Sequence, residues 1–93
     1  MVIKEDQNGD VIFVCSLAPA ARSVFLVGDF NQWNPTTIRM VAGPDGAFRA
    51  RLRLPPGDHQ YKFVADGVWL NDPDAERQVV NSYQALTSVV TVR

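Results

Sequence analysis

The sequence predicts an all-β fold, and three observations support this prediction. Apolar and strand-forming residues occur in short runs. Gly, Pro, Asn and Asp separate these runs, as turn residues separate strands. No segment places its apolar residues at the helical period of about 3.6. The length of 93 residues suits one compact unit, so we expect residues 1–93 to form a single domain.

Three strands are expected in the first half of the chain. Residues 11–17 follow an Asn-Gly-Asp turn and alternate between two faces. Residues 24–27 are an uninterrupted apolar run, which favours a strand covered on both faces. Residues 37–41 are expected to form a short third strand. The inner face of the first strand is predicted to carry Val11, Phe13, Cys15 and Leu17.

The clearest strand pattern lies at residues 48–54, after the hairpin turn Gly-Pro-Asp-Gly at 43–46. Apolar and arginine residues alternate there, so one face is expected to lie in the core and the other in water. Phe48, Ala50, Leu52 and Leu54 form the apolar set, and Arg49, Arg51 and Arg53 form the charged set.

The second half of the chain predicts three further strands. Residues 59–65 alternate, the dipeptide Asp66-Gly67 predicts a tight turn, and residues 68–70 are the return arm of that hairpin. Residues 71–78 are polar and are expected to be a loop, whereas residues 86–93 are rich in β-branched side chains. About seven antiparallel strands in a chain of this size predict an immunoglobulin-like β-sandwich.

Composition excludes several classes of partner. Apolar residues make up 46% and charged residues 20% of the chain, and the net charge of −1 gives no reason to expect nucleic acid or an anionic membrane. No apolar run approaches the ~18 residues of a membrane span. Cys15 is the only cysteine, so an internal disulfide is impossible. We expect a cytoplasmic protein, although a secreted parent protein remains compatible with the sequence.

Catalytic and metal-binding patterns are weak, and we expect neither an enzyme nor a cofactor. His59, the only histidine, falls on the predicted inner face and is interpreted as structural. Asp72, Asp74 and Glu76 have the alternate spacing of a calcium loop, but Pro73 interrupts it, so a solvated acidic loop is expected. The three arginines at 49–53 would neutralise few phosphates and are interpreted as a solubilising face.

Two tryptophans stand out because both lie next to turns among polar residues. Trp33 follows the apolar run 24–27 within Gly-Asp-Phe-Asn-Gln-Trp-Asn-Pro, and Trp69 follows the turn at 66–67. An exposed indole beside amide groups can strip water from the apolar face of a sugar while polar neighbours bind its hydroxyl rim. A single tryptophan would be interpreted as a packing residue, but the pair favours a binding surface.

Three motifs in this order resemble the family 48 carbohydrate-binding module, an early-set immunoglobulin-like domain. They are V-F-L-V-G-D-F-N-Q-W-N-P, L-P-P-G-D-H-Q-Y-K-F-V-A-D-G-V-W-L-N-D-P and N-S-Y-Q-A-L-T-S-V-V-T-V, within residues 10–93. This family includes a domain of the AMP-activated protein kinase β subunit, the N-terminal domains of glycogen branching enzymes and isoamylases, and small bacterial proteins. The resemblance implies a non-catalytic module that binds α-1,4-glucan such as glycogen, starch or maltooligosaccharide.

The resemblance also implies site residues. Trp33, Lys62 and Trp69 match the sugar-contacting positions of glucan-binding members, and Asn31 matches a residue that supports the loop. Such members also carry an asparagine before the last strand, where this chain has Thr87, which can still donate one hydrogen bond. Tyr83 is expected to replace an apolar finger that some members push against the glucan.

Two functions remain open at this point. The first is a glucan-binding module that brings a partner, such as a glycan-metabolising enzyme or a kinase, to the polysaccharide. The alternative is a protein-interaction or structural module that braces a glycoside hydrolase family 13-type enzyme or assembles a complex, with little or no sugar binding.

Overall fold

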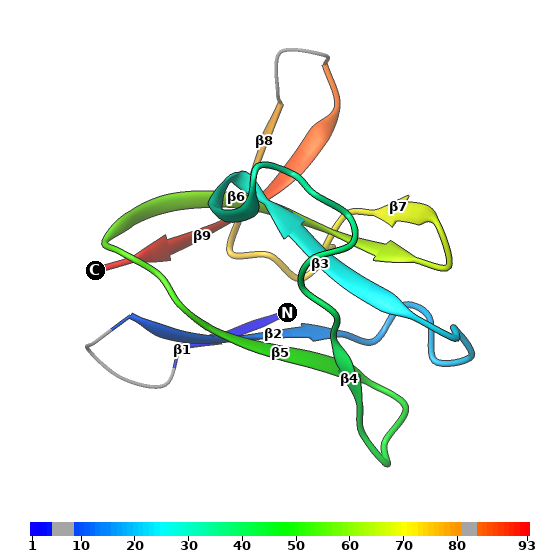
Figure 1. Cartoon of the computed structure of the whole chain (residues 1–93). Helices are drawn as coiled ribbons and strands as arrows, with labels where there is room; N and C mark the ends of the chain where they lie inside the picture. Colours follow the sequence, from blue (N-terminus) through cyan, green and yellow to red (C-terminus); the bar gives the residue numbers. More distant parts are fainter. Residues whose placement is uncertain (5–8, 81–83) are drawn as a thin grey trace.

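The computed structural model describes residues 1–4, 9–80 and 84–93 as two antiparallel β-sheets packed face to face (Figure 1). The first sheet has the order β1-β2-β5-β4, and the second has the order β3-β6-β9-β8 with β7 also pairing to β6. In Figure 1 the first sheet lies below the second. This arrangement confirms the predicted immunoglobulin-like sandwich. The strands are β1 (Val2–Lys4), β2 (Asp10–Cys15), β3 (Val24–Gly28), β4 (Val41–Ala42), β5 (Phe48–Arg53), β6 (Gly57–Ala65), β7 (Val68–Leu70), β8 (Arg77–Val80) and β9 (Leu86–Val92).

The core lies between the sheets and follows the period of two that the sequence shows. Alternate residues of β2, β3, β5, β6 and β9 point into it, and Phe13, Tyr61 and Phe63 meet there edge to face. The centroid of the Phe13 ring lies 4.9 Å from that of Tyr61. On β5 the three arginines are exposed on the opposite face, as the sequence predicts.

Four details of the predicted elements are wrong. Strand β1 was not expected, and β2 ends at Cys15, so that Leu17 lies beyond it with 45% of its surface exposed. The strand expected at residues 37–41 does not form, because residues 37–40 are irregular apart from an isolated β-bridge between Arg39 and Phe25. The expected loop at 71–78 ends early, because β8 begins at Arg77 and pairs with β9.

His59 and the turn at Asp66-Gly67 behave as expected. The His59 Nε2 lies 2.8 Å from the carbonyl oxygen of Pro55, so the ring donates to the backbone in a structural role. Asp66 and Gly67 have positive φ angles of 48° and 84°, the geometry of a tight hairpin turn that joins β6 to β7. In the described part of the chain, no helix is long and apolar enough to cross a membrane.

Gly28 ends β3 where backbone and ring crowd the position of a side chain. A Cβ at this residue would lie 2.4 Å from the carbonyl oxygen of Gln60 and 2.5 Å from the ring of Phe30. Real Cβ atoms do not approach other atoms so closely, so only glycine lets the chain turn out of the sheet here. The turn leads directly into the 3-10 helix η1 (Asp29–Asn31).

We therefore expect Gly28→Ala to lower the free energy of unfolding by about 2 kcal/mol, because overpacking forces the backbone apart. Urea unfolding followed by circular dichroism measures this loss. Gly67→Ala is the matched control, since its methyl group would meet open space at a φ of 84°. That variant is expected to lose about 1 kcal/mol through backbone strain alone. Equal losses in the two variants would contradict the crowding argument.

Candidate carbohydrate-binding surface

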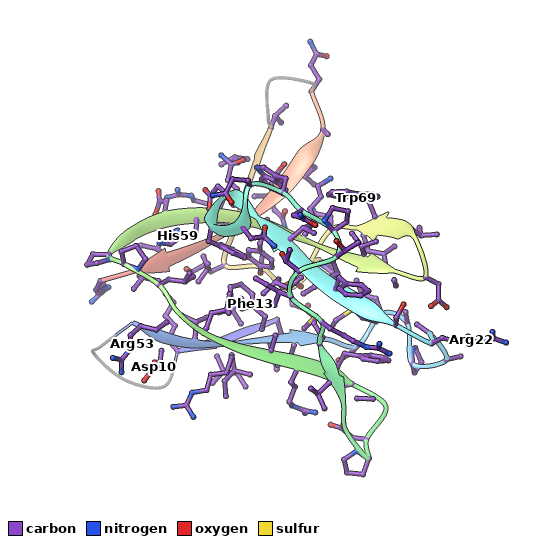
Figure 2. All side chains as sticks on the ribbon, viewed as in Figure 1. Asp10, Phe13, Arg22, Arg53, His59 and Trp69 are labelled. Atoms are coloured by element: carbon purple, nitrogen blue, oxygen red, sulfur yellow. The ribbon has the colours of Figure 1, made fainter. Side chains whose placement is uncertain are left out.

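The outer face of the second sheet carries two of the expected site residues. Trp69 on β7 pairs with Val64 on β6, so both side chains leave the sheet on the same side. Lys62 precedes Val64 by two residues on β6 and therefore shares that side. Trp69 is 48% exposed and projects from the upper sheet away from the core (Figure 2). The register thus brings an accessible indole and an ammonium group together on one surface.

Trp33 lies in the segment that follows η1, at the end of β3. Its N–H donates to the carbonyl oxygen of Gly28 at 2.8 Å, which folds the segment back on β3. Gly28 is paired with Tyr61, and the preceding residue Val27 is paired with Lys62. The backbone of the Trp33 segment therefore leaves the sheet next to the strand position of Lys62. The Trp33 side chain is half-buried.

Gln32 and Trp33 both adopt the left-handed backbone conformation, with φ of 57° and 58°. Residues other than glycine avoid this conformation, because the Cβ atom crowds the following carbonyl group. Two such residues in succession store strain, and strain of this kind concentrates at functional sites. The observation supports a role for Trp33 beyond packing.

Asn31 holds the strained segment in shape. Its Oδ1 accepts a hydrogen bond from the Gly28 N–H at 3.0 Å. Its Nδ2 lies 3.0–3.3 Å from three acceptors, which are the carbonyl oxygens of Leu26 and Asn34 and the hydroxyl oxygen of Thr37. Because its amide already binds the protein at both ends, Asn31 supports the loop rather than presenting a hydrogen-bonding group to a ligand.

Asn31→Ala is expected to lower the free energy of unfolding by about 2 kcal/mol, since it leaves several backbone groups without partners. It should also weaken glucan binding about fivefold, because Trp33 would lose its fixed position. Thermal unfolding and a fluorescence titration measure the two effects. Thr36→Ala is the control, because its hydroxyl donates only to Asn34 at 2.8 Å. A loss of stability with unchanged sugar affinity would contradict the positioning role.

Asp66 fastens the hairpin that carries Trp69 to the start of β3. Its carboxylate accepts hydrogen bonds from the N–H groups of Ser23, at 3.0 Å, and of Arg22, at 3.0 and 3.2 Å. These hydrogen bonds lower the pKa of the Asp66 carboxyl group, and the bond from the Ser23 N–H has the largest effect. A lowered pKa in the folded state means that the stabilisation is present above about pH 4 and is lost on further acidification.

Thr87 does not contribute to the surface as expected. It lies on β9 two residues before Val89, on the same face as Lys62, but its side chain is completely buried. The Thr87 hydroxyl thus has no accessible surface in this structure, and the expected contact of Thr87 with sugar stays a prediction. Tyr83 lies outside the described residues, and its expected role stays a prediction.

The acidic segment after β7 also differs from expectation. Asp72 is 1% exposed rather than solvated, and its Oδ2 accepts hydrogen bonds from the Tyr61 hydroxyl at 2.6 Å and from the Met1 ammonium at 2.5 Å. Burial, followed by the adjacent Asp72 carboxylate, raises the pKa of Tyr61. Among the described residues, no three His, Cys, Asp or Glu side chains are grouped as a metal site would require.

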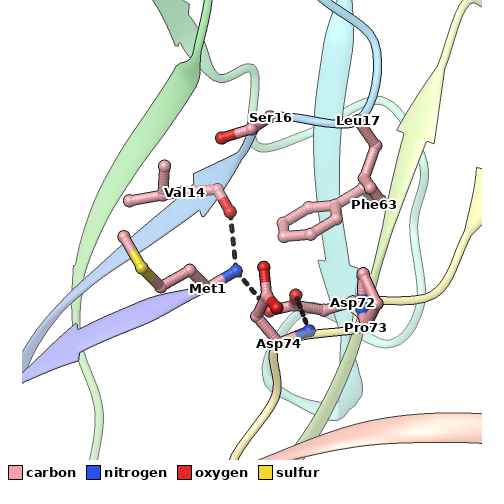
Figure 3. A pocket seen from close by; sticks show the side chains of 8 residues that line it. All are labelled: Met1, Val14, Ser16, Leu17, Phe63, Asp72, Pro73 and Asp74. Carbon is pink, nitrogen blue, oxygen red and sulfur yellow. Dashed lines mark hydrogen bonds and ion pairs between the residues drawn. The ribbon is translucent and has the colours of Figure 1, made fainter.

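A small cavity adjoins Asp72, between the start of β1 and the loop before β8 (Figure 3). Its volume is about 60 Å³, and Met1, Phe63 and Asp74 contribute to its lining. This space is large enough to hold ordered water. It is too small for a sugar ring, so the outer face of the second sheet remains the candidate site for carbohydrate.

A part of this site could not be found from the sequence. Asp29 follows β3, and its Oδ2 accepts a hydrogen bond from the Gln60 N–H at 3.0 Å, while its Oδ1 lies 3.7 Å from His59 Nδ1. In the sequence, Asp29 is only one of the polar residues that follow the apolar run 24–27. The pairing of Gly28 with Tyr61 places these residues together, and no local pattern reports that register.

Fold and surface together define a class of protein: a small β-sandwich module that presents an indole and a lysine on one sheet. Comparison with known proteins narrows this class. Residues 11–93 match the family model described as the glycogen recognition site of AMP-activated protein kinase. The chain therefore belongs to this family.

Individual relatives agree with the family match. The chain is 38% identical over 72 residues to mouse 5'-AMP-activated protein kinase subunit beta-2, covering 77% of this chain and 26% of that protein. It is 35% identical over 72 residues to the pig subunit beta-1, covering 77% and 56%. It is 45% identical over 53 residues to rice Protein FLOURY ENDOSPERM 6, chloroplastic, covering 57% and 10%. The chain thus spans about a quarter of the length of the mouse relative.

Proposed function

We propose that this chain is a non-catalytic module that binds α-1,4-glucan, such as glycogen, starch or maltooligosaccharide, and brings a partner to the polysaccharide. The observation that carries the proposal is the exposed Trp69 on the same face as Lys62, in a chain of the glycogen-recognition family. We also propose that the chain is a member of the family 48 carbohydrate-binding modules.

Each contact in the proposed site has a physical reason. The indoles of Trp33 and Trp69 stack on the apolar faces of glucose units, and Lys62 donates to their hydroxyl rims. Covering about 100–150 Å² of apolar surface on each of two sugars supplies roughly 5–7 kcal/mol before the cost of association. We therefore propose a dissociation constant of about 10 μM to 1 mM. Tyr83, which lies outside the described residues, is proposed to contact the glucan.

The partner belongs to the same proposal. Subunits of 5'-AMP-activated protein kinase are among the relatives, and the proposed partner is a kinase or a glycan-metabolising enzyme. Weak binding of one module suffices when several modules, or a module and an enzyme, act along one polymer. We place the protein in the cytoplasm, because the buried Cys15 thiol does not depend on an oxidising compartment.

A fluorescence titration tests sugar binding directly. β-Cyclodextrin and maltoheptaose are added to the protein up to about 10 mM, a range that covers the proposed affinity, and the emission of the two tryptophans is followed. A saturable change is expected with both α-linked sugars and no change with cellohexaose, whose β-linkages present a different curvature. If neither β-cyclodextrin nor maltoheptaose changes the emission, the proposal is refuted.

A second candidate function is a protein-interaction module. The outer face of the first sheet carries exposed apolar side chains, with Ile3 43% and Val41 71% exposed, beside the arginines of β5. Such side chains favour contact with another protein. In this case the apparent molar mass in solution would rise with protein concentration or with added partner protein, and tryptophan emission would not respond to sugar.

A further inference from the structure

A row of side chains crosses the outer face of the second sheet and starts at Trp69. Trp69 on β7 pairs with Val64 on β6, and Val64 pairs with Phe25 on β3 (Figure 1). Phe25 in turn forms the isolated β-bridge to Arg39. Paired residues of antiparallel strands direct their side chains to the same face. Since neighbouring strands are about 4.8 Å apart, the row extends the candidate surface from Trp69 to Phe25, about 10 Å away, and to Arg39 beyond it.

Burial of the neighbouring residues confirms that Phe25 and Arg39 face outward. The Met40 N–H donates to the carbonyl oxygen of Val24 at 2.8 Å, which holds this part of the chain beside β3. Met40 is 2% exposed and Val24 is fully buried, and both belong to the core between the sheets. Successive side chains of extended chain alternate between two faces, so Phe25 and Arg39 point away from that core. Phe25 is half-buried and Arg39 is exposed.

Phe25 and Arg39 provide the two kinds of contact that a glucose unit requires. The ring of Phe25 presents apolar surface, on which the C–H face of a sugar can lose its water. The guanidinium group of Arg39 carries five N–H donors, which can bind the hydroxyl groups at the rim of the same unit. Trp69 and Lys62 combine an indole and an ammonium group in the same manner. Val64, which is 5% exposed, lies between the two aromatic residues, so no polar side chain interrupts the row from Trp69 to Phe25.

We propose that Phe25 and Arg39 form a further glucan subsite, at which a chain bound by Trp33 and Trp69 places an additional glucose unit. This inference rests on the proposed function, because it concerns the same polysaccharide. A half-buried ring covers less of a sugar than an exposed indole does, so the subsite is expected to raise affinity about tenfold rather than more. Maltotriose is expected to occupy the contacts of Trp33 and Trp69 only, whereas maltoheptaose is long enough to reach the subsite.

Calorimetric titration with maltotriose and maltoheptaose tests the subsite in variants of its two residues. Phe25→Leu keeps an apolar side chain but removes the flat ring. Arg39→Gln removes the guanidinium group and leaves the backbone bridge to Phe25 in place. Each variant is expected to weaken binding of maltoheptaose about threefold and to leave binding of maltotriose unchanged. The comparison is made between variants for each sugar, because a longer chain also offers more registers to any single site.

Two control variants accompany these measurements. Phe25→Tyr retains the flat ring, so it is expected to bind both sugars as the parent protein does. Arg49→Gln removes an equal charge from the outer face of the first sheet, and it is also expected to leave both affinities unchanged. Maltotriose serves as an internal control for folding, because a misfolded variant would lose both sugars.

The two sugars separate the outcomes. A loss confined to maltoheptaose in Phe25→Leu and Arg39→Gln is the result that establishes the subsite. Equal weakening of both sugars in Phe25→Leu would mean that Phe25 only supports Trp69, and it would overturn the subsite. Unchanged binding of maltoheptaose in both variants would also overturn it, while the proposed function would stand. If the parent protein bound neither sugar, the proposed function would fail and the subsite with it.

Discussion

Replacing Trp69 by alanine is expected to weaken binding of β-cyclodextrin and maltoheptaose at least about tenfold. The substitution removes the exposed indole that covers one sugar face, and that coverage supplies roughly 2.5–4 kcal/mol before other costs. Trp33→Ala is expected to have a similar effect, because a second sugar would lose its apolar contact. Isothermal calorimetry measures both changes, and retention on amylose resin reports them qualitatively.

The structure offers a matched control for Trp69→Ala in its neighbour. Val68 is 59% exposed on the same short strand, but successive side chains of a strand point to opposite faces. Val68→Ala should therefore bind sugar as the parent protein does. If Trp69→Ala retained full affinity while remaining folded, the glucan would have to bind elsewhere.

Asp72→Ala is expected to produce the largest loss of stability, about 3–4 kcal/mol in the free energy of unfolding. Asp72 is buried, and the substitution would leave the Tyr61 hydroxyl and the Met1 ammonium without their acceptor. The Tyr61 hydroxyl would stay buried without an acceptor, and the Asp74 N–H and the Met1 ammonium would lose a charged acceptor, so several charge-assisted hydrogen bonds are lost together. Asp74→Ala is the control, since its side chain is exposed. Urea unfolding measures both variants. Equal losses in the free energy of unfolding would contradict the central role of Asp72.

The same contact makes stability depend on alkaline pH. Burial and then Asp72 raise the pKa of Tyr61 above that of an unfolded tyrosine, which is about 10. A raised pKa in the folded state means that the contribution is complete below about pH 10 and is lost as the pH rises further. Tyr61→Phe should remove this alkaline dependence. Its persistence in that variant would assign the effect to another group.

The architecture could be predicted because local pattern and tertiary structure agree. The alternation at Phe48–Arg53 and the turn at Asp66-Gly67 each report their own burial or geometry, and the structure confirms both. Strands β1 and β8 were missed because they are edge strands whose pairing depends on β2 and β9. A short edge strand has few buried residues and so leaves a weak periodic signal.

The site was only partly predictable, for related reasons. The alternation of β6 and the short return arm β7 suffice to place Lys62 and Trp69 on one face. The sequence gives no local sign that Thr87 is buried, and the burial of Asp72 depends on Tyr61 and Met1, which are distant in sequence. Contacts of this kind have no local signature. The Asp29 contact with β6 has the same origin.

Strand β6 pairs with β3, which precedes it by many residues, and with β9, which follows it at a similar separation. These two pairings therefore require the closure of long stretches of chain, and folds of this type form slowly. During synthesis β3 and β6 emerge well before β9, so the edge of β6 that later pairs with β9 presents unpaired N–H and C=O groups until then. A nascent chain of this protein is therefore expected to need protection by chaperones until residue 92 has left the ribosome.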